Sequence, residues 1–174
     1  MPILPVWLRE WELGGGDYSA RVAEPWDGTL VMHDIQDWSQ VSSGELGWEE
    51  VDAAGKIHFV AEAVPHPTHG ELGPVLEFGG CRICSPALET LGLIEGEGTV
   101  AADSSAYFDP EVTTRGIVRR LAIRSRILER VDERTFTVTG HGPPADVEAL
   151  SDAEFRGTEF DVVMRLDIVA ADEA

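Results

Sequence analysis

Four potential metal ligands lie close together in the stretch HPTHGELGPVLEFGGCRIC (66–84). His66 and His69 are spaced as His-x-x-His, and Cys81 and Cys84 are spaced as Cys-x-x-Cys. Zinc is commonly held by four nitrogen or sulfur ligands that arrive as two such pairs. One interpretation is therefore a zinc site made of all four side chains. Such a site stabilises the fold if the protein closes it, and supports catalysis if it keeps one position open for water.

The same cysteines allow two other interpretations. A Cys-x-x-Cys that precedes a helix can be a redox pair, because the helix N-terminus lowers the pKa of the first thiol. The segment SPALETLGL (85–93) has the signals of a short helix, with Ser85 as N-cap and Pro86 in the first turn. The flanking chain, however, lacks the βαβ pattern of a thioredoxin. The third interpretation, which we favour, makes Cys81 and Cys84 small buried side chains on opposite faces of a strand.

A second group of candidate residues lies in MHDIQDW (32–38), where His33 is close to Asp34 and Asp37. A histidine beside carboxylates can serve acid–base chemistry or metal binding. The sequence has no G-x-S-x-G elbow, P-loop, G-x-G-x-x-G or H-E-x-x-H motif. A catalytic role is therefore not favoured. The enzyme alternative is a metal-dependent one built on His66, His69 and the two cysteines, with His33 as a further candidate residue.

Tryptophans are the first set of candidate binding residues, and all five lie within the first 48 residues. Trp7 and Trp11 have the spacing of a strand, which favours a core position. Trp26 and Trp38 lie in the polar segments EPWDG and QDWSQ, so we expect them to be exposed. An exposed tryptophan can stack on a sugar or anchor a protein partner.

Arginines are the second set, and they lie in RGIVRRLAIRSRIL (115–128), the clearest strand of the chain. A row of arginines can bind an anion or an acidic partner. In so acidic a chain we expect instead that they pair with carboxylates on neighbouring strands. The alternation predicts two faces: Ile117, Leu121, Ile123 and Ile127 towards the core, and Arg120, Arg124 and Arg126 outward.

Short alternating stretches separated by turn residues predict a mainly β fold, with a β-rich α+β composition. Strands are expected at 5–13, 28–35, 56–64, 75–84, 115–128, 134–140 and 158–169, and short helices or turns at 85–93 and 146–157. The expected architecture is an antiparallel barrel or sandwich of about eight strands with one or two short helices. A single domain covers residues 1–174, and the polar loop 95–112, with one strand inside it, marks where it could divide.

Charge limits the classes of partner. The chain has 174 residues and a formal net charge of −19, although residues 113–134 hold seven basic and three acidic side chains. Such a surface repels phosphate backbones and anionic lipid, so we expect no nucleic-acid or membrane partner. No apolar run is long enough to span a bilayer, and the first residues lack the features of a signal peptide. The sequence therefore predicts a cytoplasmic protein with reduced cysteines.

Three segments resemble a family of small uncharacterised actinobacterial proteins: VWLREWEL (6–13), TTRGIVRRLAIRS (113–125) and FRGTEFDVVMRLDIV (155–169). Paired cysteines near the start, which belong to the family pattern, are missing here. The resemblance implies a small β-rich bacterial protein and assigns no activity, because the family has none assigned. The sequence thus predicts a soluble, non-enzymatic binding or interaction protein whose partner is a protein or a small molecule. A zinc enzyme or zinc-stabilised module is the alternative.

Overall fold

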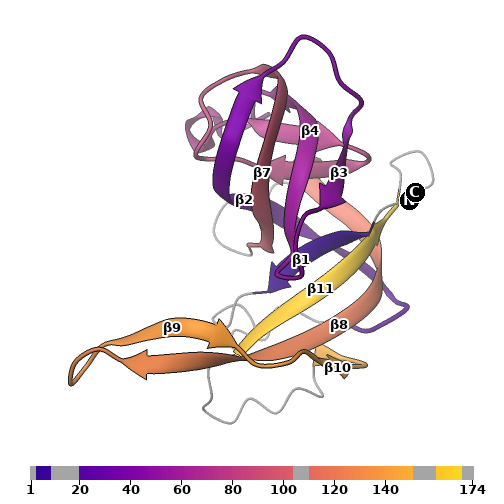
Figure 1. Ribbon diagram of the computed structural model, residues 1–174. Helices are drawn as coiled ribbons and strands as arrows, with labels where there is room; N and C mark the ends of the chain where they lie inside the picture. The colour runs from indigo at the N-terminus through magenta and orange to yellow at the C-terminus, as the bar shows by residue number, and fades with distance from the viewer. Residues whose placement is uncertain (1–2, 9–19, 104–109, 151–159, 170–174) are drawn as a thin grey trace.

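A computed structural model of the chain describes residues 3–8, 20–103, 110–150 and 160–169 (Figure 1). Within these residues the fold is mainly β, as predicted, with eleven strands where about eight were expected. The strands are β1 (Leu4–Leu8), β2 (Pro25–Gln40), β3 (Gly47–Glu50), β4 (Lys56–Val64), β5 (Val75–Phe78), β6 (Cys81–Cys84), β7 (Gly92–Ala102), β8 (Thr113–Arg130), β9 (Phe136–His141), β10 (Ala145–Val147) and β11 (Phe160–Ile168).

Strand pairing runs in two closed circuits that share β2 and β7. In the first circuit β8, β11, β1, β7 and β2 pair in that order, and β2 returns to β8. In the second circuit β2, β6, β5, β4 and β7 pair in that order, and β7 returns to β2. Three strands extend from the circuits, β3 from β4 and both β9 and β10 from β8. The long strands β2 and β7 therefore join the two parts of the molecule (Figure 1).

The sheet is mixed, which corrects the prediction of an antiparallel arrangement. β1 runs parallel to β7, with Trp7 opposite Ala101, and β2 runs parallel to β6 through Leu30 and Val31. The other pairings between these strands are antiparallel. Parallel neighbours need a crossover connection rather than a tight hairpin. Both parallel pairs join strands that are far apart in the chain, so no local turn signal marks them.

One main hydrophobic cluster fills the interior. The alternation of β4 is confirmed, because Ile57, Phe59, Ala61 and Ala63 are all buried. Phe59 stacks on Phe78 of β5 with ring centroids 5.9 Å apart. A second, smaller cluster lies apart from the first and consists of Val31, Val75, Cys84 and Val112.

The predicted alternation of β8 is interrupted by one extra residue. Val118 lies opposite Leu166 of β11, whereas Arg120 lies opposite Arg165. Arg119 is therefore a bulge in the ladder, and a bulge of one residue exchanges the two faces of a strand. Residues on either side of Arg119 consequently alternate out of phase.

The exchange of faces corrects part of the prediction for this strand. Leu121 is buried and Ile123 packs against the core, as expected. Ile117 is only half-buried, because before the bulge the even-numbered Val118 faces the core instead. Ile127 was also expected in the core, and it is 52% exposed because this end of β8 pairs with β9 beyond the closed circuit.

The prediction of a helix at residues 85–93 is wrong. Ser85 does not act as a cap, since its backbone N–H bonds to the carbonyl of Pro74 and its buried hydroxyl has no partner. Leu88 is buried in the core, and a single turn closed by its N–H on the Ser85 carbonyl is all that separates β6 from β7. That turn takes up residues 86–87, and residues 88–91 have no regular secondary structure.

The remaining expectations were met in part. β7 occupies the first part of the predicted loop 95–112, and β9 corresponds to the strand expected at 134–140. The described helical segments are two 3-10 turns, η1 (Gly70–Leu72) and η2 (Pro110–Val112), and neither has the length or apolar character needed to cross a bilayer. Trp11 and residues 151–159, part of the second expected helix, lie outside the described residues.

Candidate functional site

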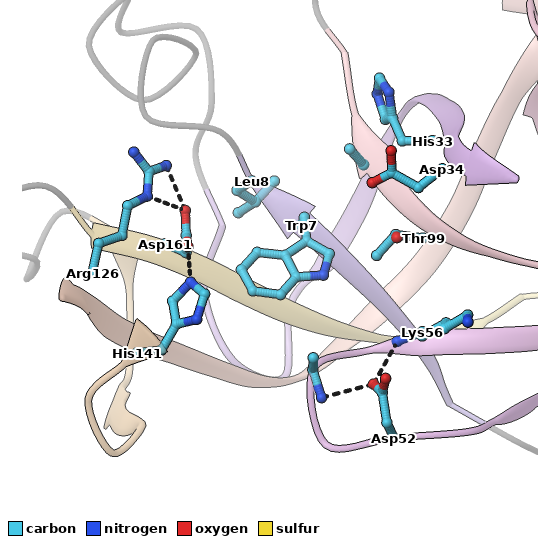
Figure 2. Close-up of a pocket in the computed structure, with 12 residues that line it drawn as sticks. Trp7, Leu8, His33, Asp34, Asp52, Lys56, Thr99, Arg126, His141 and Asp161 are labelled. Atoms are coloured by element: carbon cyan, nitrogen blue, oxygen red, sulfur yellow. Dashed lines mark hydrogen bonds and ion pairs between the residues drawn. The ribbon is translucent and has the colours of Figure 1, made fainter. Parts of the chain in front are cut away.

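A cleft of about 470 Å³ lies on the outer face of the first circuit (Figure 2). It is bounded by β1, β9 and β11 on one side and by the turn between β3 and β4 on the other, and β2 and β7 supply one end. Small-molecule pockets typically enclose about 300–1,000 Å³. The cleft brings together side chains that are far apart in the sequence, from Trp7 to Asp161.

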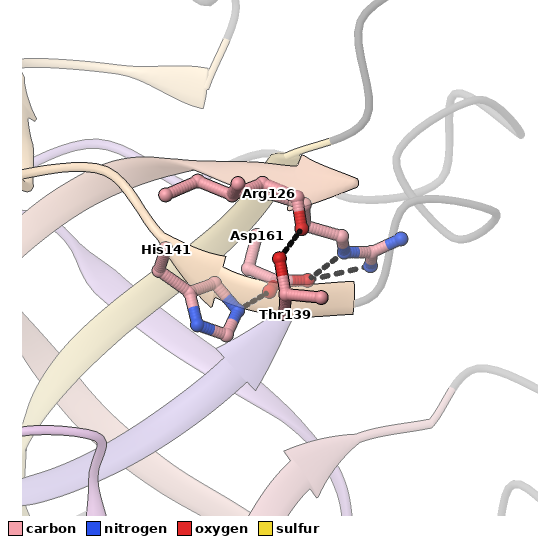
Figure 3. A network of polar contacts seen from close by, with 5 residues as sticks. Arg126, Thr139, His141 and Asp161 are labelled. Carbon is pink, nitrogen blue, oxygen red and sulfur yellow. Dashed lines mark hydrogen bonds and ion pairs between the residues drawn. The ribbon is translucent and has the colours of Figure 1, made fainter. Parts of the chain in front are cut away.

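Asp161 joins Arg126 and His141 along one wall of this cleft (Figure 3). Its Oδ1 accepts hydrogen bonds from Arg126 Nε at 2.8 Å and Nη2 at 2.5 Å, and its Oδ2 lies 2.8 Å from His141 Nε2. The strands create this arrangement. Arg126 lies opposite His141 in the β8–β9 ladder, and Asp161 lies opposite Arg124, two residues along the same face of β8.

The contact with Asp161 sets how His141 can bind. A carboxylate only accepts hydrogen bonds, so we assign the proton of the neutral His141 ring to Nε2 from this contact. Nδ1 then keeps its lone pair. His141 can therefore accept a hydrogen bond from an N–H or O–H group in the cleft, or act as a base towards it.

Trp7 provides the aromatic surface of the cleft (Figure 2). Its side chain leaves the core because it alternates with the buried Val6 on β1. The Arg124 guanidinium carbon lies 5.0 Å from the centroid of the Trp7 ring, a cation–π contact. Trp7 and His141 have ring centroids 6.3 Å apart and planes tilted by 49°. These contacts hold the indole in one orientation.

The turn between β3 and β4 closes the cleft beside Trp7. Asp52 shapes the turn, since its Oδ1 accepts the backbone N–H groups of Ala54 at 2.9 Å and Lys56 at 3.1 Å. Gly55 has φ +90°, and a Cβ at this position would lie 3.2 Å from Trp7 Nε1. A side chain here would therefore strain the backbone and press on the indole.

Lys56 follows this turn and is neutralised by a neighbouring carboxylate. Its Nζ lies 2.8 Å from Glu97 Oε2, and this hydrogen bond raises the pKa of Lys56 above its ordinary value. Lys56 is therefore a charged side chain whose charge is already balanced by Glu97, which weakens its attraction for an anion.

β2 contributes His33 and Asp34 to the opposite end of the cleft (Figure 2). The register between β2 and β7 shifts after His33 and again after Gln36, and Asp34 and Asp37 have φ of +52° and +50° there. Left-handed conformations are uncommon outside glycine, although aspartate tolerates them. The first bulge directs His33 and Asp34 to the cleft, whereas Asp37 is not among its lining residues. The structure thus separates the group noted in the sequence.

The four predicted zinc ligands do not form a metal site. Within the described residues, no group of three or more His, Cys, Asp or Glu side chains is arranged to hold a metal ion. Cys81 packs in the main core and Cys84 in the smaller cluster, because they lie on a regular strand and do not converge. His66 is buried and its Nδ1 accepts the N–H of His69 at 2.9 Å. His66 therefore holds its own loop in place, and His69 lies 3.3 Å from Glu71.

The surroundings of the same cysteines do not support the redox interpretation. Neither cysteine forms a disulfide, and both thiols are buried. Burial raises the pKa of Cys81 above its ordinary value, whereas a reactive cysteine needs a lowered one. No helix follows Cys84 to supply a compensating dipole, since the next residues form a turn. The pair fills two hydrophobic clusters, which is the interpretation that the sequence analysis favoured.

The two predicted binding tryptophans differ in position. Trp38 is 41% exposed, as expected. The prediction that Trp26 is exposed is wrong, because Trp26 is 5% exposed and belongs to the main core. Gly28 makes room for it, since a Cβ there would lie 2.5 Å from the indole. Trp7, expected in the core, lines the cleft instead.

The three predicted binding arginines have different surroundings. Arg120 pairs with Asp146 of β10 at 2.7 Å, and Arg126 pairs with Asp161 of β11, as expected for carboxylates on neighbouring strands. Arg124 lies over Trp7, and its Nε and Nη2 are buried without hydrogen-bond partners. Of the three, only Arg126 is among the residues that line the cleft.

His141 and Asp161 were not predicted as site residues from the sequence. They are twenty residues apart and come together only because β9 and β11 both pair with β8. Each lies in an otherwise ordinary strand pattern, His141 at the end of RTFTVTGH and Asp161 in FDVVM, so no local motif marks them.

The chain was compared with known proteins in three ways. No family model, curated protein or solved structure matches it. What the cleft can bind therefore follows from its own side chains.

Proposed function

We propose that this chain is a non-enzymatic binding protein, and that the cleft beside Trp7 holds a small planar molecule that is neutral or positively charged. The observation that carries this proposal is the meeting of a fixed indole, a carboxylate-oriented histidine and a concave wall in one cleft. Ligand sites are typically concave, with aromatic walls and a few convergent polar groups.

The Trp7 ring supports a planar ligand. Its orientation is fixed by Arg124, so stacking on it costs little conformational freedom. Aromatic pairs contribute roughly 0.5–1.5 kcal/mol beyond the burial of their area. The small apolar side chains of Ala54 and Ala101 lie in the same cleft and leave room for a ring.

The charges of the cleft favour a ligand that is not an anion. Its two cations are already engaged, Lys56 with Glu97 and Arg126 with Asp161. Asp34 is exposed at the end of the cleft, and the net charge of −19 repels anions in general. A ligand that donates an N–H or O–H can reach His141 Nδ1, and a positive group is attracted towards Asp34.

Binding is favoured over catalysis by what the cleft contains. Among its described lining residues Thr99 has the one hydroxyl group, and there is no thiol. His141 has the orientation of a base, but nucleophilic catalysis also needs an activated nucleophile within its reach.

The predictions of fold form, excluded partners and cellular location remain part of this proposal. The two closed circuits of strand pairing support the barrel form of the predicted fold rather than the sandwich. The negative charge supports the absence of nucleic-acid and membrane partners, and buried cysteines that form no disulfide are compatible with a reducing, cytoplasmic environment.

Three probes of the same shape and different charge test the proposal: benzamidine, benzamide and benzoate. Each is titrated into ¹⁵N-labelled protein, and the indole N–H signals of the tryptophans are followed by NMR. The signal of Trp7 is identified by its loss in Trp7→Phe. We expect benzamidine and benzamide to shift the Trp7 signal and benzoate to shift it least.

Trp38→Phe is the matched control, because it removes an exposed indole that is outside the cleft. It should leave the titrations unchanged. The proposal is wrong if none of the probes shifts the Trp7 signal at millimolar concentration, or if benzoate is the tightest of the three.

A further inference from the structure

The hairpin formed by the end of β8 and by β9 carries an unusual concentration of exposed apolar side chains. It projects from the rest of the molecule (Figure 1). Of the ten exposed large hydrophobic residues in the described chain, five lie on it: Ile127, Leu128, Val131, Phe136 and Val138. A concentration of this kind marks an interaction surface rather than the scatter normal for a soluble protein.

Pairing within the hairpin shows which of these side chains share a face. Leu128 lies opposite Val138, and Arg130 lies opposite Phe136. Residues directly opposite each other in an antiparallel ladder point to the same side. Leu128, Val138 and Phe136 therefore form one apolar face. Arg126 precedes Leu128 by two residues, so this face continues towards the cleft.

The outer edge of β9 is open, since in the described chain β9 pairs with β8 alone. The hydrogen-bonding pattern identifies the backbone groups along this edge. Val131 N–H bonds to the Thr135 carbonyl and Gly142 N–H bonds to the Ser125 carbonyl, and bonded and non-bonded pairs alternate between these points. With the register shift between Ile127 and Leu128 included, Phe136 and Val138 fall in non-bonded pairs. Their N–H groups therefore point away from β8.

Proteins normally protect such an edge with charged residues or proline. β9 has the sequence FTVTGH and contains neither Asp, Glu, Lys, Arg nor Pro. An open edge beside an apolar face is suited to the addition of another strand.

Charge indicates which strand would be added. Residues 126–141 hold three basic and three acidic side chains, so the hairpin is neutral while the rest of the chain carries the whole charge of −19. Because the rest of the chain is strongly acidic as a whole, two copies repel each other over most of their surface. The hairpin is the place where they can meet at the least electrostatic cost.

We propose that the chain associates with a second copy of itself by pairing β9 edge to edge around a two-fold axis, so that both apolar faces lie on the same side of the joined sheet and contact each other across the seam. Antiparallel pairing of a strand with its own copy uses one patch twice, as closed dimers require. The pairing places no like charges opposite each other, because β9 contains no Asp, Glu, Lys or Arg. The proposal does not depend on the identity of the cleft ligand.

Sedimentation equilibrium of the full chain tests this proposal from micromolar to millimolar concentration. We expect the mass to rise from the 18.9 kDa of one chain towards that of two and to stop there. Added salt should strengthen the association, because it screens repulsion between two acidic bodies. An association built on salt bridges would weaken instead.

Two matched double variants distinguish association through the hairpin from non-specific hydrophobic association. Phe136→Ser/Val138→Ser should abolish the association. Leu46→Ser/Val51→Ser should keep it, since Leu46 is exposed to the same 46% as Val138 but lies outside the hairpin.

Amide hydrogen exchange in the unmodified chain gives an independent measurement. Exchange at the Phe136 and Val138 amides should slow as concentration rises, while exchange at Thr137, already paired with Glu129, should change little. A single-chain mass at millimolar concentration contradicts the proposal, as does a mass that grows past two chains. Association that survives in the hairpin variant also contradicts it.

Discussion

Oδ2 of Asp161 lies 2.8 Å from Nε2 of His141, and this contact links two strands that do not pair with each other. The other carboxylate oxygen holds Arg126. One side chain thus orients a histidine ring towards the cleft and fixes the base of the projecting hairpin. Because Asp161 is only 14% exposed, water competes weakly for these contacts.

Replacing Asp161 with asparagine removes the charge that both partners use. We expect Asp161→Asn to lower the free energy of unfolding by about 1–2 kcal/mol, since a shielded charged hydrogen bond is worth more than an exposed one. It should also weaken benzamidine binding, because the orientation of His141 is lost. Urea denaturation and the NMR titration measure the two effects.

Asp146→Asn is the control for this change. Asp146 holds Arg120 in a similar contact on a neighbouring strand, but it is 67% exposed. It should change stability by less than about 0.5 kcal/mol and leave binding unaltered. Equal losses in both variants would mean that Asp161 has no special role.

Gly55 should be intolerant of any side chain. Gly55→Ala places a Cβ on a backbone with φ +90° and 3.2 Å from Trp7 Nε1. We expect a loss of stability of about 1–3 kcal/mol and a shifted Trp7 indole signal. Gly47→Ala, where a Cβ meets nothing within 4 Å, should be neutral or slightly stabilising. A fully stable Gly55→Ala with an unmoved Trp7 signal would contradict the account of the turn.

Cys81 should make stability depend on alkaline pH. Burial raises the pKa of the folded thiol, so above the ordinary cysteine pKa of about 8.5 the unfolded chain loses a proton that the folded chain keeps. The contribution is complete below that pH and is lost as pH rises, with a slope of at most about 1.4 kcal/mol per pH unit.

Cys81→Ala should remove this part of the slope, while Cys84→Ala should leave it in place. The two variants are compared by the free energy of unfolding, measured in urea between pH 8 and 10. This range lies on either side of the ordinary cysteine pKa. Lys56, whose pKa is raised by Glu97, loses its contribution only as the pH rises above the ordinary lysine pKa of about 10.4, beyond this range. An unchanged slope in Cys81→Ala would show that the thiol ionises in the folded state.

Duplex DNA provides a test of the charge argument. A chain with a net charge of −19 gains nothing from counterion release, so we expect no mobility shift at micromolar protein and roughly 0.15 M salt. A shifted band that disappears at higher salt would show that the basic segment 113–134 acts independently of the rest of the surface.

Strand alternation predicted well where strands lie in the closed circuits. β4 shows the pattern throughout, with Phe59 and Ala61 in the core. In β8 the pattern failed at Arg119, because a bulge in the pairing with β11 leaves no trace in the sequence of either strand. It failed again at Ile127, which has the alternation of a buried strand but lies beyond the sheet that would bury it.

The candidate site was harder to predict for the same physical reason. The spacing of Cys81 and Cys84 is typical of a metal or redox site. Because the two residues lie on a regular strand, however, their thiols pack in different clusters. His33 and Asp34 were recognised because they are adjacent in the chain. The contact of His141 with Asp161 depends on three strands meeting in register, which a single sequence does not encode locally.

The central claim is that the cleft beside Trp7 is a ligand site. A crystal structure of the chain soaked with benzamidine tests it most directly. The account predicts a ring stacked on Trp7, in contact with His141, with its amidinium towards Asp34. Benzamidine bound elsewhere while this cleft holds only water would contradict it.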